Sequence, residues 1–145
     1  MTTDPTSEGG GRYPQLLHTV LDTTDARGLA EFYRRFLGLR YRSGDEPPTD
    51  REDDADWLVL TDGAGGNLLA FQQTEEVTPS TWPSAQVPMQ LHLDLTVPDV
   101  AELERQHARA LELGATELLD RTDDADEPLW VFADPAGHPF CVFVG

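Results

Sequence analysis

Apolar and polar residues alternate along several short stretches of the chain, as expected for strands that bury one face. The clearest is QLHLDLTV, residues 90–97, where leucines and a valine alternate with His92, Asp94 and Thr96. Such a strand turns its leucines toward a helix and its polar side chains toward the other face of the sheet. The same patterning predicts further strands at 16–23, 39–43, 57–62, 68–73, 115–121, 129–134 and 140–145.

Two longer stretches have helical spacing instead, with apolar residues three and four positions apart. One face of the first, residues 25–38, carries Leu29, Phe32, Tyr33, Phe36 and Leu37. Gly38 is a suitable C-terminal stop for this helix. In the second stretch, residues 98–114, Asp99 is the expected N-cap and Gly114 the expected end.

The two halves of the chain repeat one order of elements. Six positions coincide at one constant offset: Leu17, His18, Leu21, Asp25, Leu29 and Leu37 with Leu91, His92, Leu95, Asp99, Leu103 and Leu111. Trp57 and Trp130 each open the third strand of their half, and an Asp-x-x-Gly turn precedes each last strand. The shared order indicates a duplication.

The pattern therefore predicts an α+β fold of two βαβββ modules, residues 15–73 and 89–145, that form one domain. The Pro-rich stretch 74–88 has no periodicity and is expected to be a linker. Residues 1–14 are polar and rich in Gly and Pro, which predicts a disordered tail.

The net charge of the protein limits the classes of molecule that it is expected to bind. The net charge is −17 and the pI about 4.3, so the surface should repel nucleic acids and anionic membranes. Cys141 is the only cysteine, which excludes an intrachain disulfide. No apolar run is long enough to span a bilayer, and the first residues lack a signal-peptide core. We expect a cytoplasmic protein.

Four stretches together resemble a known family. They are LLHT, LAEFYRRFLGL, LHLDLTVPD and the closing DPAGHPF. They are similar to the vicinal oxygen chelate superfamily, which includes glyoxalase I, extradiol dioxygenases and bleomycin- and fosfomycin-resistance proteins, and most to its glyoxalase-like members in actinobacteria. The resemblance covers about residues 15–145. It implies curled mixed sheets around a ligand-binding cup, helices outside, and a homodimer that can mix modules from two chains.

The resemblance also implies where a metal would bind. In metal-using relatives each module supplies one ligand from its first strand and one, usually a glutamate, from its last. The first-strand positions match His18 and His92. The last-strand positions match Cys141 and Ala70, or Leu69 if the hairpin register slips. Both carboxylates are thus missing, so we expect no cofactor, with a divalent metal held by the two histidines as the alternative.

Other side chains are candidates for the cup. Alternation places Asp22 and Gln72 on the same face as the ligand positions. His92 and Asp94 are the candidate catalytic pair, because a carboxylate can orient an imidazole or act as a base. The alternatives are a hydrogen-bonded interior histidine and a solvated aspartate. Trp57 and Trp130 either stack on a ligand in the cup or pack in the core. Cys141 is expected to be a buried, inert thiol.

Three functions compete. The first is a protein that binds a small organic molecule in a metal-free cup at a dimer interface, which the missing carboxylates favour. The second is a lyase, isomerase or dioxygenase-type enzyme that uses His18, His92 and Asp94, with or without a divalent metal. The third is a structural or regulatory module without a ligand, which an all-apolar cup would have favoured. His107 and His138, in a helix and a turn, are not expected to be catalytic.

Overall fold

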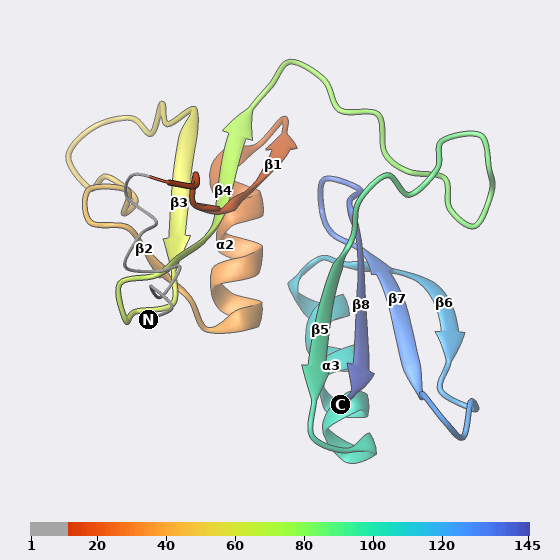
Figure 1. Cartoon of the computed structure of the whole chain (residues 1–145). Helices are drawn as coiled ribbons and strands as arrows, with labels where there is room; N and C mark the ends of the chain where they lie inside the picture. The colour runs from red at the N-terminus through yellow and green to blue at the C-terminus, as the bar shows by residue number, and fades with distance from the viewer. Residues whose placement is uncertain (1–11) are drawn as a thin grey trace.

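The computed structural model describes residues 12–145 and contains two four-stranded sheets, each with one helix (Figure 1). The first module holds β1 (Thr19–Thr23), α2 (Ala26–Leu37), β2 (Arg40–Tyr41), β3 (Trp57–Thr61) and β4 (Asn67–Gln73). The second holds β5 (Leu93–Val97), α3 (Val100–Leu113), β6 (Thr116–Arg121), β7 (Leu129–Ala133) and β8 (Pro139–Val144). The expected tail, residues 1–14, lies outside the described residues except for its last three.

Both helices begin and end where the sequence predicts. The Asp25 side chain accepts a hydrogen bond from the backbone N–H of Gly28 at the start of α2, and Asp99 does the same for Glu102 at the start of α3. Each helix ends at a glycine with a left-handed backbone, Gly38 (φ 69°) and Gly114 (φ 117°). Glycine adopts that conformation without a steric penalty, so both stops are encoded locally.

The two sheets have the same topology. The strand orders are β1-β4-β3-β2 and β5-β8-β7-β6, and in each sheet the first and last strands of the module pair in parallel while the other pairs are antiparallel. The predicted α+β fold of two βαβββ modules is confirmed.

Strand β5 is shorter than the alternation predicts. Leu93, Leu95 and Val97 do pack against the core on the helix side, as expected. The ladder with β8, however, starts at the pair Leu93–Phe140. The β8 residue before it is Pro139, which has no backbone N–H to extend the ladder. His92 therefore lies just before its strand rather than within it.

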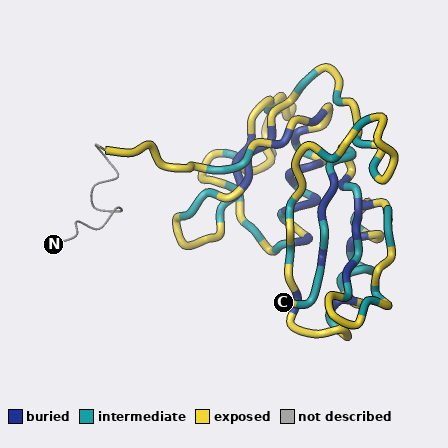
Figure 2. Tube along the Cα trace, turned by 45° about the vertical axis from the view of Figure 1, so that its right-hand side comes forward, coloured by how far each residue is buried: buried dark blue, intermediate teal, exposed yellow. Residues whose placement is uncertain are grey.

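Helix α2 is shared between the modules. Its residues Phe32, Tyr33 and Phe36 contact Phe140 of β8, with ring centroids 6.0, 6.3 and 5.7 Å apart. One buried cluster joins both halves, and Figure 2 shows the buried segments gathered in the helices and strands. Because α2 and α3 both pack on the core side of the sheets, the open faces of both sheets, opposite the helices, point away from this common core.

The connection between the modules has no helix or strand from residue 74 to residue 92, and it is exposed over much of its length (Figure 2). Over the described part of the chain, neither helix has the length and apolar character that crossing a membrane requires.

Candidate functional site

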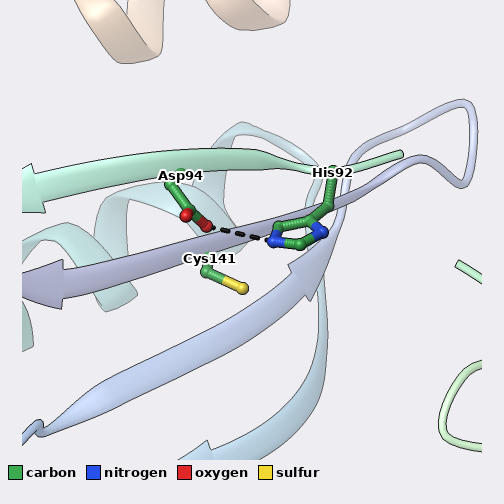
Figure 3. Close-up of side chains that lie close together, drawn as sticks. All are labelled: His92, Asp94 and Cys141. Atoms are coloured by element: carbon green, nitrogen blue, oxygen red, sulfur yellow. Dashed lines mark ion pairs between the residues drawn. The ribbon is translucent and has the colours of Figure 1, made fainter. Parts of the chain in front are cut away.

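Three polar side chains meet on the open face of the second sheet. Asp94 lies in β5, and His92 is the residue just before this strand. Cys141 comes from β8, where it pairs with Asp94 (Figure 3). The His92 Nε2 lies 3.2 Å from Asp94 Oδ1. One ligand atom from each residue falls within 4.8 Å of the others. Strand pairing thus assembles an imidazole, a carboxylate and a thiol at one place.

The surroundings of Cys141 favour the protonated, less reactive form of its thiol. Burial, together with the negative charge and hydrogen bonding of Asp94, raises the pKa of Cys141 to about 11. The side chain is half-buried between its neighbours. The expectation of an inert thiol therefore has a physical cause, although its carboxylate neighbour was not part of that expectation.

The first sheet offers a different arrangement at the equivalent position. Ala70 is fully buried although it lies on the open face, where it pairs with Val20 and Val59. Along the direction of the strands, Ala70 lies between the positions of His18 and Trp57. The ring centroids of these two side chains are 5.9 Å apart. The approach of these two rings on the open face is consistent with the complete burial of Ala70.

One ring nitrogen of His18 makes no hydrogen bond with the described residues. This atom, Nδ1, is buried. Leu69, the other candidate for the last-strand position, faces the core instead. The register thus favours Ala70 as the position that matches Cys141.

Trp130 lies on the opposite face from the other candidates. It starts no strand, because β7 begins at Leu129, and it pairs with the core residue Val142. Its ring stacks on His107 of α3 with centroids 3.8 Å apart. His107 in turn places its Nε2 2.8 Å from Glu117 Oε1. Trp130 is therefore a helix-packing residue here, whereas Trp57 is 36% exposed on the open face of its sheet.

A cavity of about 450 Å³ brings together candidates from both modules. It holds Asp22 and Gln72 of the first module and His92 of the second. Its lining comprises Val20, Leu21, Asp22, Gln72, Thr78, Ser80, Val87, Pro88, Gln90, Leu91, His92, Leu93, Gly137, His138 and Pro139. Its size is within the usual range for small-molecule sites. His18, Trp57, Ala70, Asp94 and Cys141 are not in the lining.

His138 also lines this cavity, although it was not among the candidates predicted from the sequence. Its Nε2 lies 2.7 Å from the backbone oxygen of Asp22. A carbonyl only accepts, so Nε2 carries the proton. This contact joins the last hairpin of the second module to β1 of the first. The turn position of His138 was visible in the sequence, but its partner 116 residues away was not.

The residues present do not fit the metal set that the resemblance implies. That set needs a histidine and a carboxylate from each module, and the first module supplies the buried Ala70 at the carboxylate position. Among the described residues, His92, Asp94 and Cys141 are the only group of three such side chains close enough to share an ion. They would form a nitrogen, oxygen and sulfur set, in which Cys141 must first lose its proton.

Solved structures with the same fold are similar over nearly the whole chain. The fosfomycin resistance protein FosX from Mesorhizobium loti matches with a TM-score of 0.63 and 16% identity, covering 92% of this chain and 94% of that one. A mutant of FosX from Listeria monocytogenes, complexed with Mn(II) and 1S,2S-dihydroxypropylphosphonic acid, matches with a TM-score of 0.66, 16% identity and the same coverage. A glyoxalase/bleomycin resistance protein/dioxygenase family enzyme from Burkholderia phytofirmans PsJN matches with 0.64 and 15%, covering 88% and 96%.

At these identities the similarities establish the fold alone and no activity. No curated protein matches the sequence significantly. The family model described as a glyoxalase-like domain matches residues 18–143, which is most of the chain. This chain belongs to the glyoxalase-like domain family.

Proposed function

We propose that this protein binds a small organic molecule without the metal site that the resemblance implies. The observation that carries the proposal is the first-module position, where Ala70 stands in place of a carboxylate and is fully buried on the face that also carries His18 and Trp57. An ion held by both modules would lack its oxygen ligands there. Polar side chains that could contact an organic ligand remain, including Asp22, Gln72 and His92.

The proposal includes a homodimer whose cup lies between two chains. The open face of the first sheet exposes Val20, Trp57 and Leu68, by 38%, 36% and 44% of their surfaces. The second module of the same chain approaches this face only at the cavity beside Val20, and it leaves all three side chains exposed. A second copy that contributes its open face, with His92 and Asp94, would cover these apolar side chains and enclose a ligand.

The solved relatives give a useful contrast. One FosX structure is described as a complex with Mn(II) and a phosphonic acid. A phosphonate needs cationic or metal partners, whereas the cup candidates here are imidazoles, amides and carboxylates. The proposed ligand is therefore of a different chemical kind.

Elemental analysis tests the proposal that the protein binds its ligand without a metal ion. The protein is purified with and without added Ni, Zn, Mn and Fe, and His18→Ala is measured in parallel. We expect no stoichiometric metal in either sample. Stoichiometric metal that disappears in His18→Ala would contradict the proposal, because it would require an ion bound at the first-module position.

An enzymatic alternative rests on the cluster in the second module. His92 lies 3.2 Å from Asp94, close enough for the carboxylate to orient the imidazole during proton transfer. With Cys141 the same side chains could hold a divalent ion. Titration with Co(II) tests whether Cys141 helps to bind a divalent ion, since a thiolate ligand gives an intense charge-transfer band that Cys141→Ser would remove. A band that persists in the variant is not due to a thiolate, because Cys141 is the only cysteine, and would contradict this metal site.

The single cysteine allows a test of the shared cup that needs no ligand. His18→Cys places a second thiol near the proposed cup, and a short bifunctional thiol reagent then joins it to Cys141. A cup made by two chains gives a covalent dimer on a denaturing gel. The control, His18→Cys with Cys141→Ser, should give far less dimer. An internally crosslinked monomer as the main product would overturn the dimeric cup and favour a cup within one chain.

A further inference from the structure

The cavity of about 450 Å³ between the modules contains polar side chains with no protein partner. The side chains of Asp22, Gln72 and Gln90 make no hydrogen bond or ion pair with the described residues. Asp22 and Gln72 are direct neighbours on β1 and β4. One carboxylate and two amides thus face a space that is otherwise largely apolar, and they are free to bind a ligand.

The linker supplies one wall of this cavity. Thr78, Ser80 and Val87 line it. The wall has a defined shape, because Thr81 donates its backbone N–H to the Val87 oxygen at 2.8 Å and accepts from the Val87 N–H with Oγ1 at 2.9 Å. These bonds close a loop in residues 81–87. The segment that joins the modules is therefore also built into the site.

The linker wall lies in close contact with the second module at Gly137. A Cβ added at Gly137 would lie 2.4 Å from Cβ of Pro79, so only glycine lets the linker approach the last turn so closely. Gly137 also has a φ of +94°, which disfavours other residues. Its counterpart in the first module, Gly65, has a φ of +97° and nothing within 4 Å. The contact is thus peculiar to the cavity side.

The cavity lining holds a carboxylate but no arginine or lysine. Among the residues that the structure describes, its ionisable side chains are Asp22 and the imidazoles of His92 and His138, and Nε2 of His138 is already bonded to the Asp22 backbone oxygen. The sequence contains no lysine at all, and the net charge is −17. An anionic ligand would meet no guanidinium or ammonium group here, while a cation would be attracted to Asp22 and to the protein as a whole.

We propose that the cavity walled by the linker binds an organic cation, with Asp22 as counter-ion and the Gln72 and Gln90 amide oxygens as acceptors for its N–H groups. The apolar lining, including Val20, Val87 and Leu91, would contact its hydrocarbon part. This inference rests on the proposed small-molecule binding but places the ligand within one chain, beside the proposed dimeric cup. It names a ligand class and a wall that the cup proposal does not require.

Three probes with one ring system test the charge preference: 2-naphthylmethylamine, 2-naphthalenemethanol and 2-naphthoate. Each is titrated into ¹⁵N-labelled protein while the side-chain amide signals of Gln72 and Gln90 are followed by NMR. We expect the amine to shift these signals saturably, the alcohol more weakly and the acid least. Equal or stronger binding of the acid, or no saturable shift with any probe at millimolar concentration, would overturn the inference.

Matched variants separate a specific ion pair from general attraction. Asp22→Asn should weaken binding of the amine by about five- to tenfold, as expected for a partly exposed ion pair, and leave the alcohol unchanged. Asp123→Asn removes the same charge from an exposed turn outside the cavity and should have little effect. Equal effects of the two variants would show that only net charge matters and would refute the role of Asp22.

Two glycine variants test the wall. Gly137→Ala and Gly65→Ala share the same backbone strain, but only the first displaces Pro79. We expect Gly137→Ala to weaken amine binding severalfold more than Gly65→Ala when both are folded by their NMR spectra. If the amine instead shifts the signals around Trp57 and Cys141, this cavity is the wrong site while small-molecule binding at the cup still stands.

Discussion

The hydroxyl of Tyr33 ties α2 of the first module to the last hairpin of the second. It donates a hydrogen bond of 2.6 Å to Oδ2 of Asp134. Tyr33 is fully buried and Asp134 is 3% exposed. The other carboxylate oxygen accepts from the backbone N–H groups of Ala136 and His138, which shapes the turn beside the cavity. Both partners are thus sealed from water.

The change Tyr33→Phe removes the only side-chain donor to Asp134 Oδ2 within residues 12–145 and leaves that oxygen buried with no partner among them. Hydrogen bonds to charged groups contribute roughly 1.5–3 kcal/mol, and water cannot replace this one. We therefore expect the free energy of unfolding to fall by about 2–3 kcal/mol. For a chain of this size that corresponds to a Tm lower by about 8 °C.

Urea denaturation followed by far-UV circular dichroism measures this loss, and Tyr41→Phe is the control. Tyr41 donates 2.7 Å to Glu31 Oε2 in a half-exposed setting, where water can take over. Its loss should cost about 1 kcal/mol or less. If Tyr33→Phe costs no more than Tyr41→Phe, the Asp134 contact does not join the modules as the geometry indicates.

The pH dependence gives a second check with a definite sign. Burial raises the pKa of Asp134, and the hydrogen bond from Tyr33 partly offsets this. A carboxyl whose folded pKa is raised favours the folded state below its unfolded pKa and loses that stabilisation as pH rises through the folded pKa. Without the Tyr33 hydroxyl the pKa rises further. The stability difference between wild type and Tyr33→Phe should therefore widen from acid to neutral pH.

Three further outcomes follow from the same structure. Asp134→Asn should destabilise the protein by about 2 kcal/mol in urea titrations and Asp62→Asn by clearly less, because Asp62 holds the matching turn but is exposed and lacks a tyrosine partner. Alkylation of Cys141 by iodoacetamide should be about tenfold slower at pH 8 than that of a free thiol and keep rising to pH 10, while Asp94→Asn should speed it. Phe140→Ala should cost about 4 kcal/mol, since that ring is fully buried where both modules meet; a loss below about 1 kcal/mol would contradict the shared core.

The alternating pattern and the repeat were enough to predict the modules, because both signals are local. Glycine stops and aspartate caps act within one helical turn, so Gly38, Asp99 and Gly114 could be identified without tertiary information. Leu93, Leu95 and Val97 were assigned correctly to the helix side for the same reason, but Leu91 was not: it is 59% exposed and lines the cavity. The extent of β5 was not, since Pro139 on its partner strand limits it.

The face of the sheet on which a side chain lies, and the distant residue that it contacts, were decided by the tertiary structure alone. Trp57 and Trp130 are equivalent in the repeat, yet β7 starts one residue before Trp130, and one residue is enough to turn a side chain to the other face. The meeting of Asp94 with Cys141 depends on which strands pair and in which register. The cavity and the Tyr33–Asp134 bond depend on how the modules pack, which no periodicity along the chain encodes.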